Sequence, residues 1–167
     1  RPELRVPGEV PELGGSGSVI LVLDNSLSMD LREGEGTLLT EARDQAVSLV
    51  RGLPDGVLVG AVTIGGEATR LTPSLSADRE RVAMALEGVA QTQGVTDLAG
   101  GLRLARQLLA GGEGEIVVLS DEAGPTAVPA AREELELLAA QGASVLPHPI
   151  SSNAPANTAV QDARYGD

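Results

Sequence analysis

The chain has 167 residues, of which 42% are hydrophobic, and this is enough for one domain with a sizeable core. Its formal net charge of -12 disfavours binding to nucleic acids and to anionic membrane surfaces, and it favours cations or basic partners. The sequence contains neither cysteine nor lysine, which excludes disulfides, thiolate metal sites and mechanisms that depend on a lysine side chain. No apolar stretch approaches the roughly 20 residues that a membrane-spanning helix needs.

The first strong signal follows an irregular lead-in over residues 1–17, which is rich in proline and glycine. Five consecutive apolar residues, 19–23, predict a fully buried strand. Asp24 comes directly after this run, and Ser26 and Ser28 alternate with it along the next loop. Ligands of parallel α/β sheets bind beyond the carboxyl ends of the strands, so we expect this carboxylate and these two hydroxyls to face one point.

The rest of the chain alternates helices and strands. Apolar spacing predicts a helix over 37–53 after a polar loop, a strand over 57–64, and a hairpin at Gly65-Gly66 that leads into an antiparallel edge strand over 67–71. The other predicted elements are helices from Ser76 or Asp78 to Val89, over 97–110 and after Pro125 or Pro129, and strands over 115–119 and 144–146. This order predicts a three-layer, Rossmann-like, doubly wound α/β fold with a mostly parallel sheet.

Two segments near the end of the chain have plain structural interpretations. The glutamates at 133, 134 and 136 indicate a solvated helix face, and Pro147 and Pro149 are expected to end the last strand with His148 at a surface turn.

Two further positions supply oxygen ligands. Asp121 follows the strand over 115–119 through Ser120, which repeats the arrangement at Asp24. Thr96 precedes a predicted helix, where its spacing alone is also explained by an N-cap. Asp30 and Asp97 lie beside these candidates and are expected to support them or to face solvent. An oxygen-only set favours Mg²⁺ or Mn²⁺ over zinc or copper, which prefer imidazole or thiolate ligands.

The pattern D-x-S-x-S at 24–28, with its apolar strand and the following Met29, resembles the metal-ion-dependent adhesion site of von Willebrand factor type A domains. In that family a second loop adds a threonine and a third adds an aspartate. The resemblance therefore implies a cation site made of Asp24, Ser26, Ser28, Thr96 in G-V-T-D-L and Asp121 in I-V-V-L-S-D. One departure is Glu122, which stands where the family usually has glycine.

The resemblance implies a non-enzymatic module in which bound Mg²⁺, or else Mn²⁺ or Ca²⁺, captures an Asp or Glu carboxylate of a partner protein. One alternative is a metal-dependent phosphoryl-transfer enzyme that uses Asp24, similar to haloacid-dehalogenase-like phosphatases. Those enzymes need a second aspartate two positions later and a lysine, whereas this chain has Ser26 and no lysine. The other alternative is a scaffold domain without metal.

The resemblance also divides the chain. It predicts a lead-in over 1–17, a von Willebrand factor type A domain over 18–150, and an extension over 151–167 with one further edge strand at 158–163. The sequence D-N-S-x-S-M and the flanks at 1–7 and 157–164 resemble bacterial membrane-anchored proteins of the aerotolerance type. This implies an extracytoplasmic domain of a larger anchored protein, without direct membrane insertion by this segment.

Overall fold

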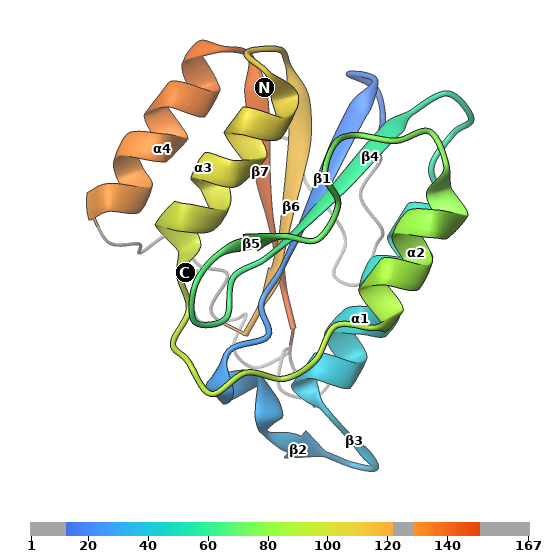
Figure 1. The fold of residues 1–167 in the computed structure, drawn as a ribbon, viewed down its shortest axis with the longest axis vertical. Coiled ribbons are helices and arrows are strands. Elements are labelled where there is room, and N and C mark those ends of the chain that lie inside the picture. The colour runs from blue at the N-terminus through green and yellow to red at the C-terminus, as the bar shows by residue number, and fades with distance from the viewer. Residues whose placement is uncertain (1–12, 122–128, 151–167) are drawn as a thin grey trace, which may run out of the picture.

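The computed structural model describes residues 13–121 and 129–150. Most of the predicted lead-in, Glu122 and the predicted extension over 151–167 lie outside these ranges. The described residues form a five-stranded sheet in the order β5-β4-β1-β6-β7 (Figure 1). Its strands are β1 (Ser18–Leu23), β4 (Leu58–Thr63), β5 (Thr69–Arg70), β6 (Gly114–Ser120) and β7 (Ala143–Pro149). Neighbouring strands are parallel except β5, which is antiparallel to β4 at one edge.

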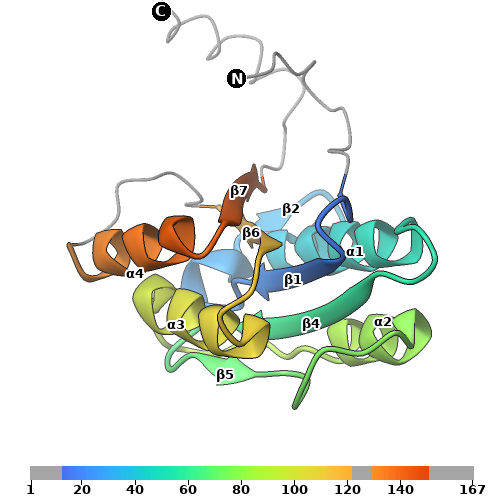
Figure 2. The ribbon, with the colours of Figure 1, turned by 90° about the horizontal axis from the view of Figure 1, so that it is seen from above.

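Two helical layers cover the sheet. They contain α1 (Leu38–Arg51), α2 (Arg79–Glu87), α3 (Leu98–Leu109) and α4 (Pro129–Ala140). Figures 1 and 2 show α1 and α2 on one side and α3 and α4 on the other. Successive side chains of a strand point to opposite faces, so Leu21 packs in the α1–α2 layer and Ile20 in the α3–α4 layer. The three-layer, doubly wound fold is therefore confirmed.

The helix starts settle two open alternatives. Asp78, and not Ser76, caps α2, because its Oδ1 accepts a hydrogen bond from Arg81 N at 3.2 Å. Asp97, and not Thr96, caps α3, because its Oδ1 accepts a hydrogen bond from Gly100 N at 3.0 Å. The hydroxyl of Thr96 is thus available for contacts elsewhere.

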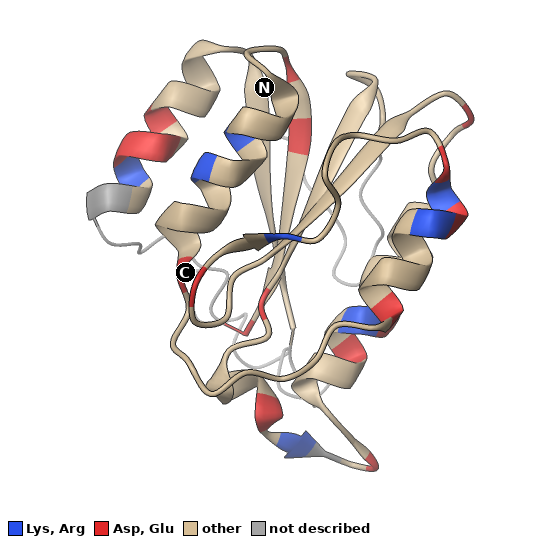
Figure 3. Cartoon of the chain, viewed as in Figure 1, with Lys and Arg blue, Asp and Glu red and all other residues tan. Residues whose placement is uncertain are grey.

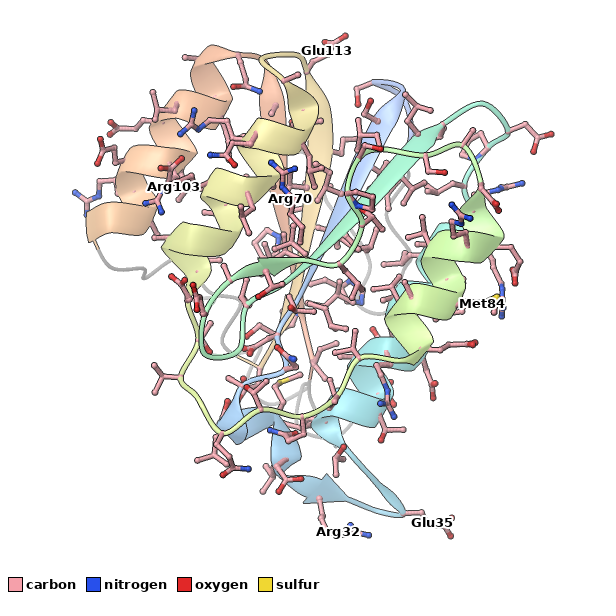
Figure 4. All side chains as sticks on the ribbon, viewed as in Figure 1. Arg32, Glu35, Arg70, Met84, Arg103 and Glu113 are labelled. Atoms are coloured by element: carbon pink, nitrogen blue, oxygen red, sulfur yellow. The ribbon has the colours of Figure 1, made fainter. Side chains whose placement is uncertain are left out.

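A small hairpin replaces the predicted loop over 31–36. It follows the 3-10 helix η1 (Leu27–Asp30) and pairs β2 (Arg32–Glu33) with β3 (Gly36–Thr37) in antiparallel fashion. Gly34 has a φ of 67°, a conformation that glycine adopts without strain and that allows the two-residue turn. Figure 4 labels Arg32 and Glu35, which extend from this hairpin. Strands of two residues are too short to produce an alternating pattern in the sequence.

The prediction that β7 ends at residue 146 was wrong, because the strand continues to Pro149 and pairs with β6 throughout. Proline is tolerated here since β7 is an edge strand, where a missing N–H costs no ladder hydrogen bond. His148 is consequently not at a surface turn. Its half-buried ring places Nε2 2.5 Å from Gln45 Oε1 in α1, and burial lowers the pKa of His148.

The glutamate run is only partly a solvated face. Glu134 is 5% exposed, and its carboxylate accepts hydrogen bonds from Arg103 Nε at 3.2 Å and from Arg106 Nε at 2.8 Å. Both arginines belong to α3, so this ion cluster joins α3 to α4; Figure 4 labels Arg103 where α3 faces α4. Elsewhere charged residues lie mainly on outer helix faces and on the β2–β3 hairpin (Figure 3).

None of the helices in the described ranges is long and apolar enough to cross a membrane.

Candidate metal centre

Three loops meet at the edge where the parallel strands β1, β4 and β6 end. Asp24 follows β1, and its backbone N–H donates to Leu119 O of β6 at 2.9 Å. Asp121 follows β6 directly. Thr96 is bridged to Gly65, which lies just beyond β4. Because β1 and β6 run in the same direction, Asp24 and Asp121 reach the same edge, and the bridge to Gly65 holds Thr96 beside them.

The five predicted ligands form one continuous series of contacts. Thr96 Oγ1 lies 3.2 Å from Asp24 Oδ2 and 3.1 Å from Ser26 Oγ. Ser26 Oγ lies 3.3 Å from Ser28 Oγ, and the hydroxyl of Ser28 donates to Asp121 Oδ1 at 3.1 Å. The structure thus brings together, from three separate segments, all five side chains that the sequence predicted as cation ligands.

Exposure changes steadily across the site. Asp24 is 0% exposed, whereas Asp121 and Thr96 are half-buried and Ser28 is exposed. The buried carboxylate of Asp24 accepts hydrogen bonds from Ser26 N at 2.9 Å and from Ser120 Oγ at 2.5 Å. The site therefore has a fixed, dry floor and a side that solvent reaches.

The donor set fits a hard divalent cation. It consists of three hydroxyls and two carboxylates, which are the oxygen ligands that Mg²⁺ and Mn²⁺ prefer. Neighbouring ligands in a Mg²⁺ octahedron, with metal–oxygen distances of about 2.0–2.1 Å, lie about 2.9 Å apart. The oxygens here are 3.1–3.3 Å apart, close to that spacing. Over 13–121 and 129–150, no three His, Cys, Asp or Glu side chains group as an alternative metal site.

Asn25 organises the site although the sequence analysis did not single it out. It is 5% exposed, and its Oδ1 accepts a hydrogen bond from Gly65 N at 2.8 Å while its Nδ2 donates to Ala90 O at 2.8 Å. Its backbone oxygen accepts from Thr92 N and from Thr92 Oγ1, both at 2.9 Å. Asn25 therefore fastens the loop after β1 to both segments that position Thr96.

Two glycines allow these loops to approach one another closely. A Cβ at Gly65 would lie 2.5 Å from the backbone carbon of Asn25, and one at Gly94 would lie 2.3 Å from the Cα of Gly66. Real Cβ atoms essentially never come this near, so only glycine fits at either position without a backbone shift.

Ser120 makes a second contact that the sequence does not predict, namely the hydrogen bond to Asp24. Its signal was its place between a buried strand and an aspartate. Asp30 is exposed, as expected. The Asp97 carboxylate instead caps α3 and accepts from Ala68 N at 3.2 Å, so it joins the start of α3 to the segment beyond β4.

Among solved structures, the chain is similar to an aerotolerance-related membrane protein from Bacteroides fragilis NCTC 9343 that carries multiple mutations to serine. They share 23% identity with a TM-score of 0.68, over 80% of this chain and 67% of that chain. Manganese-loaded TRAP from Plasmodium vivax shares 16% identity with a TM-score of 0.64, over 91% and 65% of the two chains. A von Willebrand factor type A protein from Catenulispora acidiphila shares 17% identity with a TM-score of 0.63, over 79% and 33%.

At these identities the likeness concerns the fold alone. The chain spans about two thirds of the first two proteins and one third of the last. Comparison with curated protein sequences found no significant match. The sequence model of the von Willebrand factor type A domain, in contrast, matches residues 19–124, well over half of the chain and all of the loops described above. The chain therefore belongs to the von Willebrand factor type A domain family.

Proposed function

We propose that this chain is a cation-dependent protein-binding module. In it, Asp24, Ser26, Ser28, Thr96 and Asp121 hold Mg²⁺ or Mn²⁺, and the cation captures an Asp or Glu carboxylate of a partner protein. The observation that carries the proposal is the unbroken series of oxygen contacts among these side chains at the edge of the sheet. Relatives in the fold include one solved with manganese.

The buried and the exposed residues of the site have different roles in this proposal. Asp24 is a buried carboxylate on the floor, and a buried charge is costly unless a counter-charge or hydrogen bonds compensate it. Ser28 and Asp121 lie on the side that solvent reaches, so a partner's carboxylate would approach there. A cation held directly by the three neutral hydroxyls, with the carboxylates of Asp24 and Asp121 reaching it through water, would keep the positive charge that attracts a partner's carboxylate.

Phosphoryl transfer through Asp24 has less support. A nucleophilic carboxylate must reach its substrate, but Asp24 is 0% exposed, and hydroxyl or backbone donors lie within 3.2 Å of both its oxygens. Ser26 also occupies the position where that chemistry needs a second aspartate.

Saturating Mg²⁺ or Mn²⁺ is expected to raise the melting temperature of the wild-type chain relative to EDTA. A ligand at about 100 times its dissociation constant stabilises the folded state by roughly 2.7 kcal/mol. For a domain of this size the shift should be roughly 5 to 11 °C. Asp24→Ala removes the buried carboxylate and should abolish the shift. Differential scanning calorimetry makes the measurement, and an unchanged wild-type melting temperature would instead favour the metal-free scaffold.

A matched pair of variants tests whether Asp121 is a ligand of the cation. Asp121→Ala should reduce the Mg²⁺-dependent shift more than Glu122→Ala, because Asp121 contacts Ser28 within the series of oxygens. Both substitutions remove one acidic side chain, so general electrostatic effects are alike. Equal reductions would show that the third loop is assigned wrongly.

We further infer that the chain belongs to a longer, membrane-anchored protein with this domain on the extracytoplasmic side. The support is its similarity to an aerotolerance-related membrane protein of Bacteroides fragilis. Fractionation of cells that express the full-length protein, followed by protease treatment of intact cells or spheroplasts, is expected to place the domain in the membrane fraction and in reach of the protease. Recovery in the cytosolic fraction would contradict the inference.

A further inference from the structure

Strongly exposed apolar side chains stand directly beside the candidate ligands. Leu27, between Ser26 and Ser28, is 49% exposed, and Val95, which precedes Thr96, is 80% exposed. The two segments are hydrogen-bonded to each other, because Leu27 N donates to Gly94 O at 2.9 Å. Leu31 is 60% exposed at the end of η1, where its N–H donates to Ser28 O at 3.4 Å. We call Leu27, Leu31 and Val95 the apolar collar.

Three of the six large hydrophobic side chains exposed in the described ranges belong to the collar. The other large hydrophobic side chains exposed in the described ranges are dispersed over three different elements: Leu58, Met84 and Leu137. Leu58 begins β4, at the end of the sheet opposite the site, while Met84 points away from α2 in Figure 4. Isolated exposed hydrophobics are ordinary, whereas several around one site indicate a surface that a partner covers.

The surrounding charge restricts what that partner can be. Asp30 is exposed directly before Leu31, Asp121 is half-exposed within the site, and the chain carries a net charge of -12. A segment with several acidic residues would be repelled by this field, although the cation can bind one carboxylate. Aliphatic residues beside that carboxylate in the partner add no charge. On binding they cover the collar and remove its apolar surface from water.

We propose that the apolar collar selects protein segments in which one Asp or Glu is flanked by aliphatic side chains and no second acidic residue. This proposal rests on the cation-dependent function proposed above. In this arrangement the cation fixes the carboxylate, and the collar contacts the residues on either side of it. The collar thus determines which acidic residues are accepted, a choice that the cation alone cannot make.

Three short capped peptides test the proposal with the whole chain and Mg²⁺. Their central sequences are Leu-Asp-Leu, Ser-Asp-Ser and Leu-Asn-Leu, and binding is followed by NMR chemical-shift titration, which detects weak affinities. Leu-Asp-Leu is expected to bind at least about tenfold more tightly than Ser-Asp-Ser, as small apolar contacts can provide. Leu-Asn-Leu should bind weakly because it lacks the carboxylate.

Variants test whether the collar causes the preference for Leu-Asp-Leu over Ser-Asp-Ser. Leu27→Ser and Val95→Ser should each bring the affinities for the two Asp peptides to within about twofold of each other. Met84→Ser, on α2 and with an exposure between those of Leu27 and Val95, should leave the tenfold preference intact. The collar side chains are exposed, so melting temperatures in EDTA should stay at the wild-type value and confirm folding. A wild-type chain without preference, or variants that retain it, would overturn the proposal.

The two proposals fail separately. A chain that shows the Mg²⁺-dependent melting shift but binds none of the peptides has a cation site without collar selection, which overturns only the present proposal. A chain without the melting shift overturns the cation-dependent function, and the collar proposal fails with it.

Discussion

Replacing Asn25 with alanine is expected to lower the free energy of unfolding by about 2 to 3 kcal/mol. The substitution removes the acceptor of the Gly65 N–H, and Gly65 is buried, so this donor is left without a partner or water. It also leaves a small cavity beneath the loop after β1. Ala90 is exposed, and its carbonyl can accept from water instead of Asn25 Nδ2. Urea unfolding measures the change.

Asn25→Ala should also weaken Mg²⁺ binding, which a purely structural contact would not do. The Asn25 side chain holds Gly65, which is bridged to Thr96, so its loss frees Thr96 to move away from Asp24. The matched control is Thr92→Val: it removes one hydrogen bond to Asn25 O, but Thr92 N still donates to that oxygen. A smaller loss of stability and little change in Mg²⁺ affinity are expected for it. If Asn25→Ala unfolds more easily yet binds Mg²⁺ as the wild type does, Asn25 supports the fold alone.

The edge of the sheet that carries the site could be predicted because its signals are local. A buried apolar run followed by aspartate occurs at Asp24 and again, after Ser120, at Asp121, and parallel strands bring their carboxyl ends together. Asn25 gave no such signal. Its side-chain partners lie 40 and 65 residues away in the sequence, and an asparagine after a strand ordinarily indicates only a turn.

Thr96 shows where spacing alone is insufficient. Thr96 and Asp97 are adjacent, and both residue types cap helices, so the sequence cannot decide between them. In the folded chain, Asp97 also accepts from Ala68 N beyond β4, and this contact from another element fixes Asp97 as the cap. The choice thus depends on tertiary structure.

The wrong predictions for β7 and Glu134 also arose because the outcome depends on tertiary structure. Proline suggested an end to β7, but its cost in a strand depends on whether the strand lies at an edge, which is a property of the whole sheet. Glu134 lies in a run of glutamates, and helical periodicity does not reveal that two arginines of α3 face it.

Removing both arginines from this ion cluster is expected to cost about 3 kcal/mol of unfolding free energy in the double variant Arg103→Ala/Arg106→Ala. The Glu134 side chain is only 6% exposed, so its carboxylate would stay buried without a counter-charge. The value is at the lower end for buried pairs because the arginine side chains are 50% and 29% exposed and already partly solvated. Calorimetry should show a fall of roughly 6 to 12 °C in melting temperature.

Adding Glu134→Met to the double variant should restore most of the loss, because methionine has a similar volume and carries no charge to bury. Recovery would show that an unpaired buried carboxylate, and not lost arginine packing, causes the destabilisation; a triple variant no more stable than the double would show the reverse. The cluster also bears on the candidate site, since α3 begins two residues after Thr96, and α4 is the next described element after Asp121. Loosening α3 against α4 should therefore weaken Mg²⁺ binding in the double variant, and the triple variant should recover affinity together with stability.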